Sequence, residues 1–72
     1  MPLIQVKVFE QELTTKQTQD LIGGITDVVT SVTSDKLRDV TWVVVDEVPS
    51  GNWGIGGKAL GLDDVKKIVE GG

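Results

Sequence analysis

The residue best suited to chemistry is Pro2, which directly follows Met1. An initiator methionine is normally trimmed when a small residue such as proline follows it. Trimming would give Pro2 a free secondary amine, which can take up and release a proton near neutral pH. A free α-amino group has a reference pKa of about 7.7–8.0 and a secondary prolyl amine starts higher, so an apolar pocket or a nearby cation must lower the pKa of a prolyl base. Without any function, proline is also tolerated as the first residue of a strand.

Few other side chains offer a neutral-pH base, because the chain contains no histidine and no cysteine. A zinc site is nearly excluded and disulfides cannot form. The glycine-rich stretch 51–57, GNWGIGG, lacks the GxxxxGK[ST] spacing of a phosphate loop. We therefore expect no metal, no nucleotide and no other cofactor.

Two tryptophans, an isoleucine and an arginine are the candidate pocket residues. Trp53 and Ile55 stand within the glycine-rich stretch, which is a poor place for simple core packing, so we expect them to line a pocket. Trp42 lies inside an apolar strand, where core or interface packing is the alternative. Arg38 could bind a substrate carboxylate through its planar fork, and its alternative is a solvated surface side chain.

The elements that position these residues follow from hydrophobic periodicity. Ile4, Val6 and Val8 alternate with polar residues, which predicts a strand over 2–9 with one buried face. Thr14 and Gln17 fit a capping box at the start of a helix that reaches about residue 33. Its apolar stripe consists of Leu21, Ile22, Ile25, Val28, Val29 and Val32. Gly23 and Gly24 inside this helix predict a neighbour packed closely against the bare backbone.

The second half of the chain contains a second strand and a hairpin. After a predicted loop at 34–39, the run VTWVVVDEV at 40–48 is apolar enough for a strand covered on both faces. Strand, helix and strand then form a right-handed βαβ unit with parallel strands. A glycine-rich hairpin follows, and Asp63 or Asp64 could cap a short last helix. We expect one α/β (α+β) domain over residues 1–72.

Length and charge limit the classes of function. A chain of 72 residues is marginal alone and usually needs a staple, so we expect a homo-oligomer. The formal net charge is −4 and the basic residues are scattered, which argues against a nucleic-acid partner. No segment has the length and hydropathy of a membrane span or a signal peptide, so we expect a cytoplasmic protein without a membrane partner.

Pro2, the βαβ unit and the run VVVDEVPSGNWGIGGKAL together resemble the 4-oxalocrotonate tautomerase family. The resemblance implies a tautomerase/MIF-like fold that assembles as a hexamer, a trimer of βαβ dimers with four-stranded sheets, with a dimer or trimer as the alternative. It implies that Pro2 shuttles a proton in a small enol, dienol or 2-oxo acid. Trp53 matches the hairpin aromatic that keeps the family's pocket apolar.

Two positions depart from the family's pattern. Its best-known members carry carboxylate-binding arginines where this chain has Glu12 and Trp42. Arg38 is the expected substitute, with Lys16, Lys36 and Lys58 as weaker candidates. Two alternatives remain open: a non-catalytic oligomer that keeps the fold, and a dehalogenase or hydratase of unsaturated acids in which Glu12 or Glu47 activates water.

Overall fold

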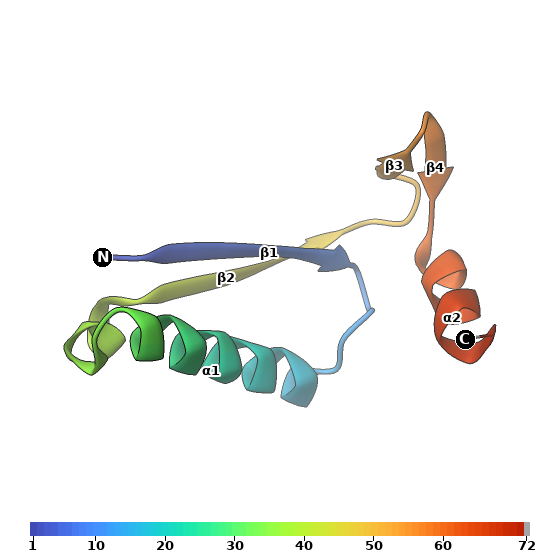
Figure 1. Cartoon of the computed structure of the whole chain (residues 1–72). Coiled ribbons are helices and arrows are strands. Elements are labelled where there is room, and N and C mark those ends of the chain that lie inside the picture. Colours follow the sequence, from blue (N-terminus) through green and yellow to red (C-terminus); the bar gives the residue numbers. More distant parts are fainter. Residues whose placement is uncertain (72) are drawn as a thin grey trace.

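The computed structural model describes residues 1–71 as a mixed α and β chain, and confirms the predicted βαβ unit with its C-terminal hairpin (Figure 1). The elements in chain order are β1 (Leu3–Phe9), α1 (Thr15–Val32), the 3-10 helix η1 (Asp35–Val40), β2 (Trp42–Val48), β3 (Trp53–Ile55), β4 (Lys58–Leu60) and α2 (Leu62–Gly71).

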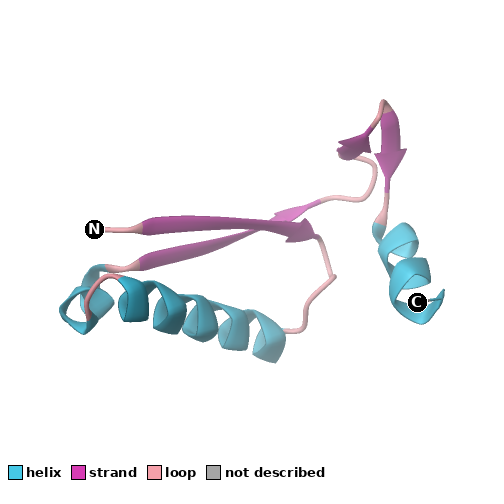
Figure 2. Cartoon of the chain, viewed as in Figure 1, coloured by secondary structure: helices cyan, strands magenta, loops and turns pink. Residues whose placement is uncertain are grey.

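β1 and β2 form a two-stranded parallel sheet, with α1 lying along one face of it (Figure 2). The register runs from Leu3 opposite Trp42 to Phe9 opposite Val48. The predicted strand 40–48 is wrong at its start, since Val40 belongs to η1. The predicted loop at 34–39 is also mostly helical, because the Ser34 hydroxyl caps η1 by accepting the Lys36 backbone N–H at 3.2 Å.

The predicted capping box at the start of α1 is confirmed. The Thr14 hydroxyl accepts the Gln17 backbone N–H at 3.1 Å, and the Gln17 side-chain oxygen accepts the Thr14 N–H at 2.9 Å. Two backbone donors that a helix start leaves unpaired are thereby satisfied. A cap of this kind stabilises a helix by about 1 kcal/mol.

The predicted hairpin is confirmed as well. Trp53 lies opposite Leu60, and Gly56 and Gly57 form the turn with φ angles of 57° and 84°. Two consecutive residues with positive φ are the signature of the type I′ turn, whose twist matches the flanking strands. This turn fixes Trp53 and Ile55 on one short strand.

The last helix, α2, begins at Leu62, two or three residues earlier than a cap at Asp63 or Asp64 predicts. The Asp64 side chain instead reaches back and accepts the Gly61 N–H at 2.9 Å, so Asp64 lies in the first turn. The Ser50 hydroxyl accepts the Leu62 N–H at 2.9 Å. This bond attaches α2 to the segment before the hairpin.

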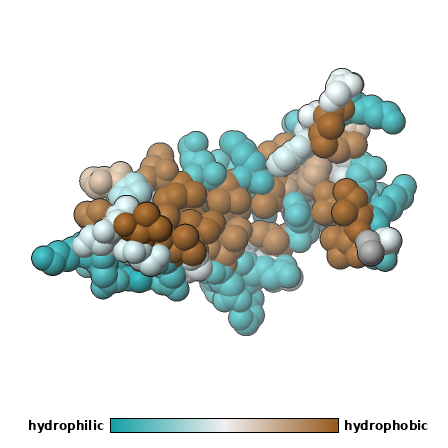
Figure 3. Space-filling view, in the orientation of Figure 1, coloured by the Kyte–Doolittle hydropathy of each residue, from teal (hydrophilic) through white to brown (hydrophobic). Residues whose placement is uncertain are grey.

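The chain is extended and leaves much of its apolar surface uncovered. Its extents are 42 × 24 × 20 Å and its radius of gyration is 14.9 Å, against about 11 Å for a compact domain of this length. Phe9, at 4% exposure, is the one hydrophobic residue in the described chain that is buried. Figure 3 shows apolar residues gathered over the βαβ body and again on the arm that carries α2.

β2 is not covered on both faces within one chain, contrary to the expectation from its apolar sequence. Trp42 is 58% exposed and Val44 is 37% exposed on the face away from α1. Exposed apolar patches of this kind mark association surfaces. Within residues 1–71, none of the helices combines the length and the hydropathy that crossing a bilayer requires.

Candidate functional site

Pro2 and Trp42 meet at the N-terminal end of the sheet. The Trp42 backbone N–H donates to the Pro2 carbonyl at 3.0 Å, which holds the start of β1 against the start of β2. Ile4 faces the groove beside α1, so Leu3 and its partner Trp42 face the other side of the sheet. Pro2 is half-buried, and the exposed indole of Trp42 lies on the Leu3 side of the sheet.

Arg38 lies near the same end, but its guanidinium turns toward α1. It donates to the Asp27 carboxylate at 2.8 Å, to the Asp35 carboxylate at 3.1 Å and to the Thr30 hydroxyl at 3.1 Å. The hydrogen bonds to Asp27 and, second, to Asp35 raise the pKa of Arg38 above its ordinary value. The contacts tie η1 to α1, and the substrate-binding role of Arg38 stays a prediction.

Trp53 and Ile55 lie at the opposite end of β1. The Trp53 ring packs on Phe9 with ring centroids 4.9 Å apart, while Ile55 is 61% exposed at the hairpin tip. The six residue steps from Leu3 to Phe9, at about 3.3 Å each, separate the two ends by about 20 Å. One chain therefore does not bring Pro2 and Trp53 into a single pocket.

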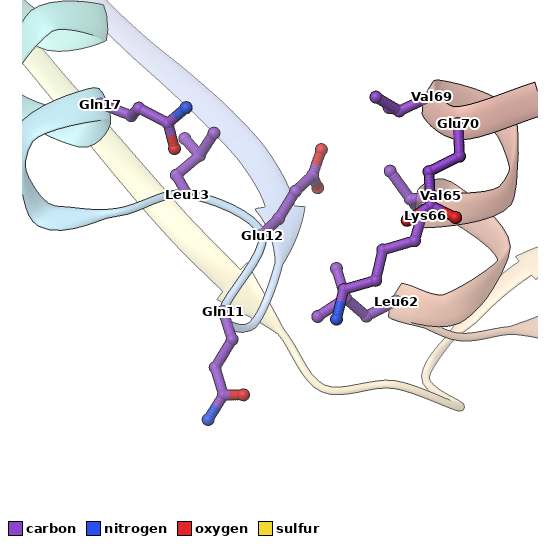
Figure 4. Close-up of a pocket in the computed structure, with 9 residues that line it drawn as sticks. All are labelled: Gln11, Glu12, Leu13, Gln17, Leu62, Val65, Lys66, Val69 and Glu70. Carbon is purple, nitrogen blue, oxygen red and sulfur yellow. The ribbon is translucent and has the colours of Figure 1, made fainter. Parts of the chain in front are cut away.

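A hollow of about 350 Å³ lies between the β1–α1 loop and α2, at the Trp53 end of the sheet. Figure 4 shows Glu12 and Leu13 on the loop side and Lys66 among apolar side chains of α2 on the helix side. Its apolar lining consists of Leu13, Leu62, Val65 and Val69. Lys66 is the one cation that lines it, and sequence reasoning missed it, because two adjacent lysines in a short helix look like ordinary surface charge.

Two other candidate polar residues lie on the exposed surface. Lys16 pairs with Asp20 at 2.9 Å on the exposed face of α1, and Glu47 is exposed near the end of β2. No group of three carboxylates within residues 1–71 comes together in a way that could hold a metal ion.

Comparison with known proteins identifies close relatives of the chain. The family model described as tautomerase enzyme matches residues 2–63. The probable tautomerase K2 of Dickeya dadantii is 35% identical over 60 residues, covering 83% of this chain and 88% of the relative. A probable tautomerase of Helicobacter pylori strain J99 is 34% identical over 62 residues, covering 83% and 90%.

Solved structures agree with these sequence matches. DmpI from Helicobacter pylori superposes with a TM-score of 0.72 at 33% identity, covering 81% of this chain and 94% of that one. A 4-oxalocrotonate tautomerase isozyme from Methylibium petroleiphilum superposes with a TM-score of 0.72 at 28% identity, covering 81% and 90%. The family match ends at residue 63, so most of α2 lies beyond it.

Proposed function

Since the chain belongs to the tautomerase enzyme family, we propose that it is a cofactor-independent tautomerase of a small enol, dienol or 2-oxo acid. The Pro2 amine, freed by removal of Met1, acts as general base and then as general acid. The observation that carries this proposal is that Pro2 opens the family match and is half-buried before β1, where its carbonyl accepts the Trp42 backbone N–H. Met1 is 81% exposed, so its peptide bond is accessible to an aminopeptidase.

The proposed reaction moves one proton and needs no oxidant or reductant. The neutral Pro2 nitrogen takes the proton of the enol hydroxyl and leaves the O–H electron pair on the enolate oxygen. That pair then forms the carbonyl π bond while the C=C electron pair takes the proton back from the Pro2 ammonium as a new C–H bond. A base placed this way typically contributes about 10²–10⁴-fold to the rate.

The pocket of this tautomerase must be shared between subunits, because Trp53 lies far from Pro2 within one chain. Within one chain Pro2 is only half-buried, and desolvation is what lowers the pKa of an amine. The Trp53 indole of a second copy would complete the cover. A shared pocket also accounts for the apolar surface that one chain leaves exposed.

The backbone of β1 supports a specific way of sharing. Trp42 N–H bonds to Pro2 C=O and Glu10 N–H bonds to Val48 C=O, so the even-numbered residues of β1 bond to β2. Backbone groups of a strand alternate in direction, so those of the odd-numbered residues point to the free edge. Antiparallel pairing of this edge with the same edge of a second copy, about a two-fold axis, gives a four-stranded sheet. It also brings Pro2 of one subunit near the Phe9 and Trp53 end of the other.

An apolar groove beside this edge fits the same partner. The groove has a volume of about 510 Å³ and lies between β1 and α1. A side chain at Gly23 or Gly24 would meet nothing within 4 Å in one chain, so the predicted close neighbour is absent there. The second copy's α1 would lie across it. The groove is lined mainly by Ile4, Leu21, Gly24, Ile25, Val28 and Val29.

A hexamer of three such dimers covers the remaining surface best. The dimer leaves exposed the sheet face that carries Leu3, Trp42 and Val44, as well as the tip of the hairpin at Ile55.

For the substrate, the hollow beside α2 offers one ammonium, Lys66, and an apolar wall. Glu12 and Glu70 in the same hollow disfavour a second carboxylate. A monocarboxylic acid with an apolar body therefore fits it best.

Activity of the processed protein on phenylenolpyruvate tests the proposal. Mass spectrometry should show loss of Met1, and Pro2→Ala should lower kcat/KM for ketonisation by at least about 100-fold. Lys67→Gln, on the exposed side of α2, is the matched control and should keep the rate. Equal rates in Pro2→Ala and the unchanged protein would end the proposal. Turnover of 3-chloroacrylate in place of the enol would favour the dehalogenase alternative.

A further inference from the structure

The free edge of β1 ends abruptly at Phe9, where Glu12 occupies both backbone groups. The Glu12 carboxylate accepts the Phe9 N–H at 2.9 Å, and the Glu12 N–H donates to the Phe9 carbonyl at 3.0 Å. Gln11 takes a positive φ of 67° to make this return possible. Glu12 thus binds the edge of β1 where a pairing strand would otherwise bind.

The capped edge leaves Leu3, Gln5 and Lys7 with backbone groups open to a partner. Two copies of this segment pair completely in one antiparallel register, with Gln5 opposite Gln5 and Leu3 opposite Lys7. If Phe9 were also open, a longer register would compete, in which Leu3 pairs with Phe9 and the two-fold axis passes through Val6. The state of Phe9 decides between these two registers.

We propose that Glu12 is a positioning residue that fixes the register in which β1 pairs with a second copy of the chain, with the two-fold axis at Gln5. In this register Pro2 lies opposite the partner's Val8, next to the partner's Phe9 and Trp53. The longer register would slide the two strands by two residues, or about 7 Å, and move Pro2 past this pocket wall. The consequence for catalysis rests on the proposed function, whereas the register does not.

Side-chain charge agrees with this register. Gln5 faces Gln5 across the axis, where two amides can form hydrogen bonds. The two Lys7 residues then lie about 14 Å apart along the strands. An axis at Lys7 would instead place the two ammonium groups directly opposite each other, which destabilises a strand pair.

Single-cysteine cross-linking tests the register, because the natural chain has no cysteine. Gln5→Cys should form a disulfide-linked dimer on mild oxidation, since hydrogen-bonded antiparallel partners have Cα atoms about 5.5 Å apart, within the range a disulfide spans. Lys7→Cys is the matched control on the same sheet face and should stay monomeric on a denaturing gel. Absence of the Gln5→Cys dimer would overturn the proposed register.

Two further variants isolate the role of Glu12. In the Gln5→Cys chain, Glu12→Asp withdraws the carboxylate from Phe9 and should reduce the dimer band by about tenfold, the effect of one charge-assisted hydrogen bond. A tagged Glu12→Asp/Gln5→Cys chain mixed with Glu12→Asp/Lys7→Cys should instead gain a mixed dimer. Glu12→Gln keeps an acceptor of the same reach and should keep the original band.

An unchanged band in Glu12→Asp, with circular dichroism showing a folded chain, would contradict the role of Glu12. These gels contain no substrate, so a failed Pro2 assay leaves their result standing. If both proposals hold, Glu12→Asp also lowers kcat on phenylenolpyruvate, because small displacements of reacting groups are costly.

Discussion

Phe9 connects the hairpin to the sheet, and Phe9→Leu should loosen the pocket wall that Trp53 forms. The Phe9 side chain is 4% exposed and its ring lies 4.9 Å from that of Trp53. An aromatic pair contributes about 0.5–1.5 kcal/mol beyond its buried area. Adding the smaller volume of leucine in a packed site brings the expected loss to about 1–2 kcal/mol.

Fluorescence and thermal unfolding measure this loss. In a Trp42→Phe background only Trp53 emits, and Phe9→Leu should shift its emission to longer wavelength because the indole loses its cover. The Tm should fall by about 4–8 °C for each kcal/mol lost in a domain of this size. Both proteins must be compared at one concentration, because association raises apparent stability. An unchanged emission maximum together with an unchanged Tm would refute the claim that Phe9 anchors the hairpin.

Four further changes give separate tests. Thr14→Ala removes the hydroxyl of the capping box and should lower the free energy of unfolding by about 1 kcal/mol in urea titrations. Arg38→Gln should lower Tm but leave KM unchanged, because its guanidinium is held by two aspartates and a threonine; a higher KM at constant Tm would favour substrate binding. Lys66→Gln should raise KM for a monocarboxylic acid more than for its methyl ester, and equal changes would exclude an ionic contact. Gln5→Pro should shift the oligomer toward monomer in sedimentation, because proline removes an edge-facing N–H while the β1–β2 bonds persist; an intact oligomer would exclude pairing through this edge.

The elements that local chemistry determines could be predicted from the sequence. The alternation in 2–9 lets one face of a strand be buried, and this pattern is complete within a few residues. The same is true of the backbone hydrogen bonds made by the Thr14 and Gln17 pair and of the glycine turn at 56–57. The 3-10 helix was not predicted, because a serine such as Ser34 is favoured both in loops and as a helix N-cap, and the sequence does not decide between the two. The start of α2 was missed because Asp64 accepts the Gly61 N–H from inside the helix.

The site itself could be predicted only as a set of residue types. Pro2 and Trp53 lie at opposite ends of β1, so a second chain is needed to bring them together, and a single sequence carries no direct signal of that geometry. Arg38 was predicted from its planar fork and as a substitute for the family's arginines, whereas its hydrogen bonds to Asp27 and Asp35 depend on the packing of η1 on α1. Glu12 reads as an unfavourable replacement for a cation until its bonds to Phe9 are seen.

The titration of the Pro2 amine tests the central claim most directly. The protein, with Met1 removed and at oligomer-forming concentration, would be labelled with ¹⁵N at proline and followed by NMR across pH 4–10. A shared apolar pocket predicts a pKa below the α-amino reference of about 7.7–8.0, with kcat/KM falling as pH drops through the same value. A pKa at or above that reference, or an amine still blocked by Met1 in the cell's own protein, would contradict the account.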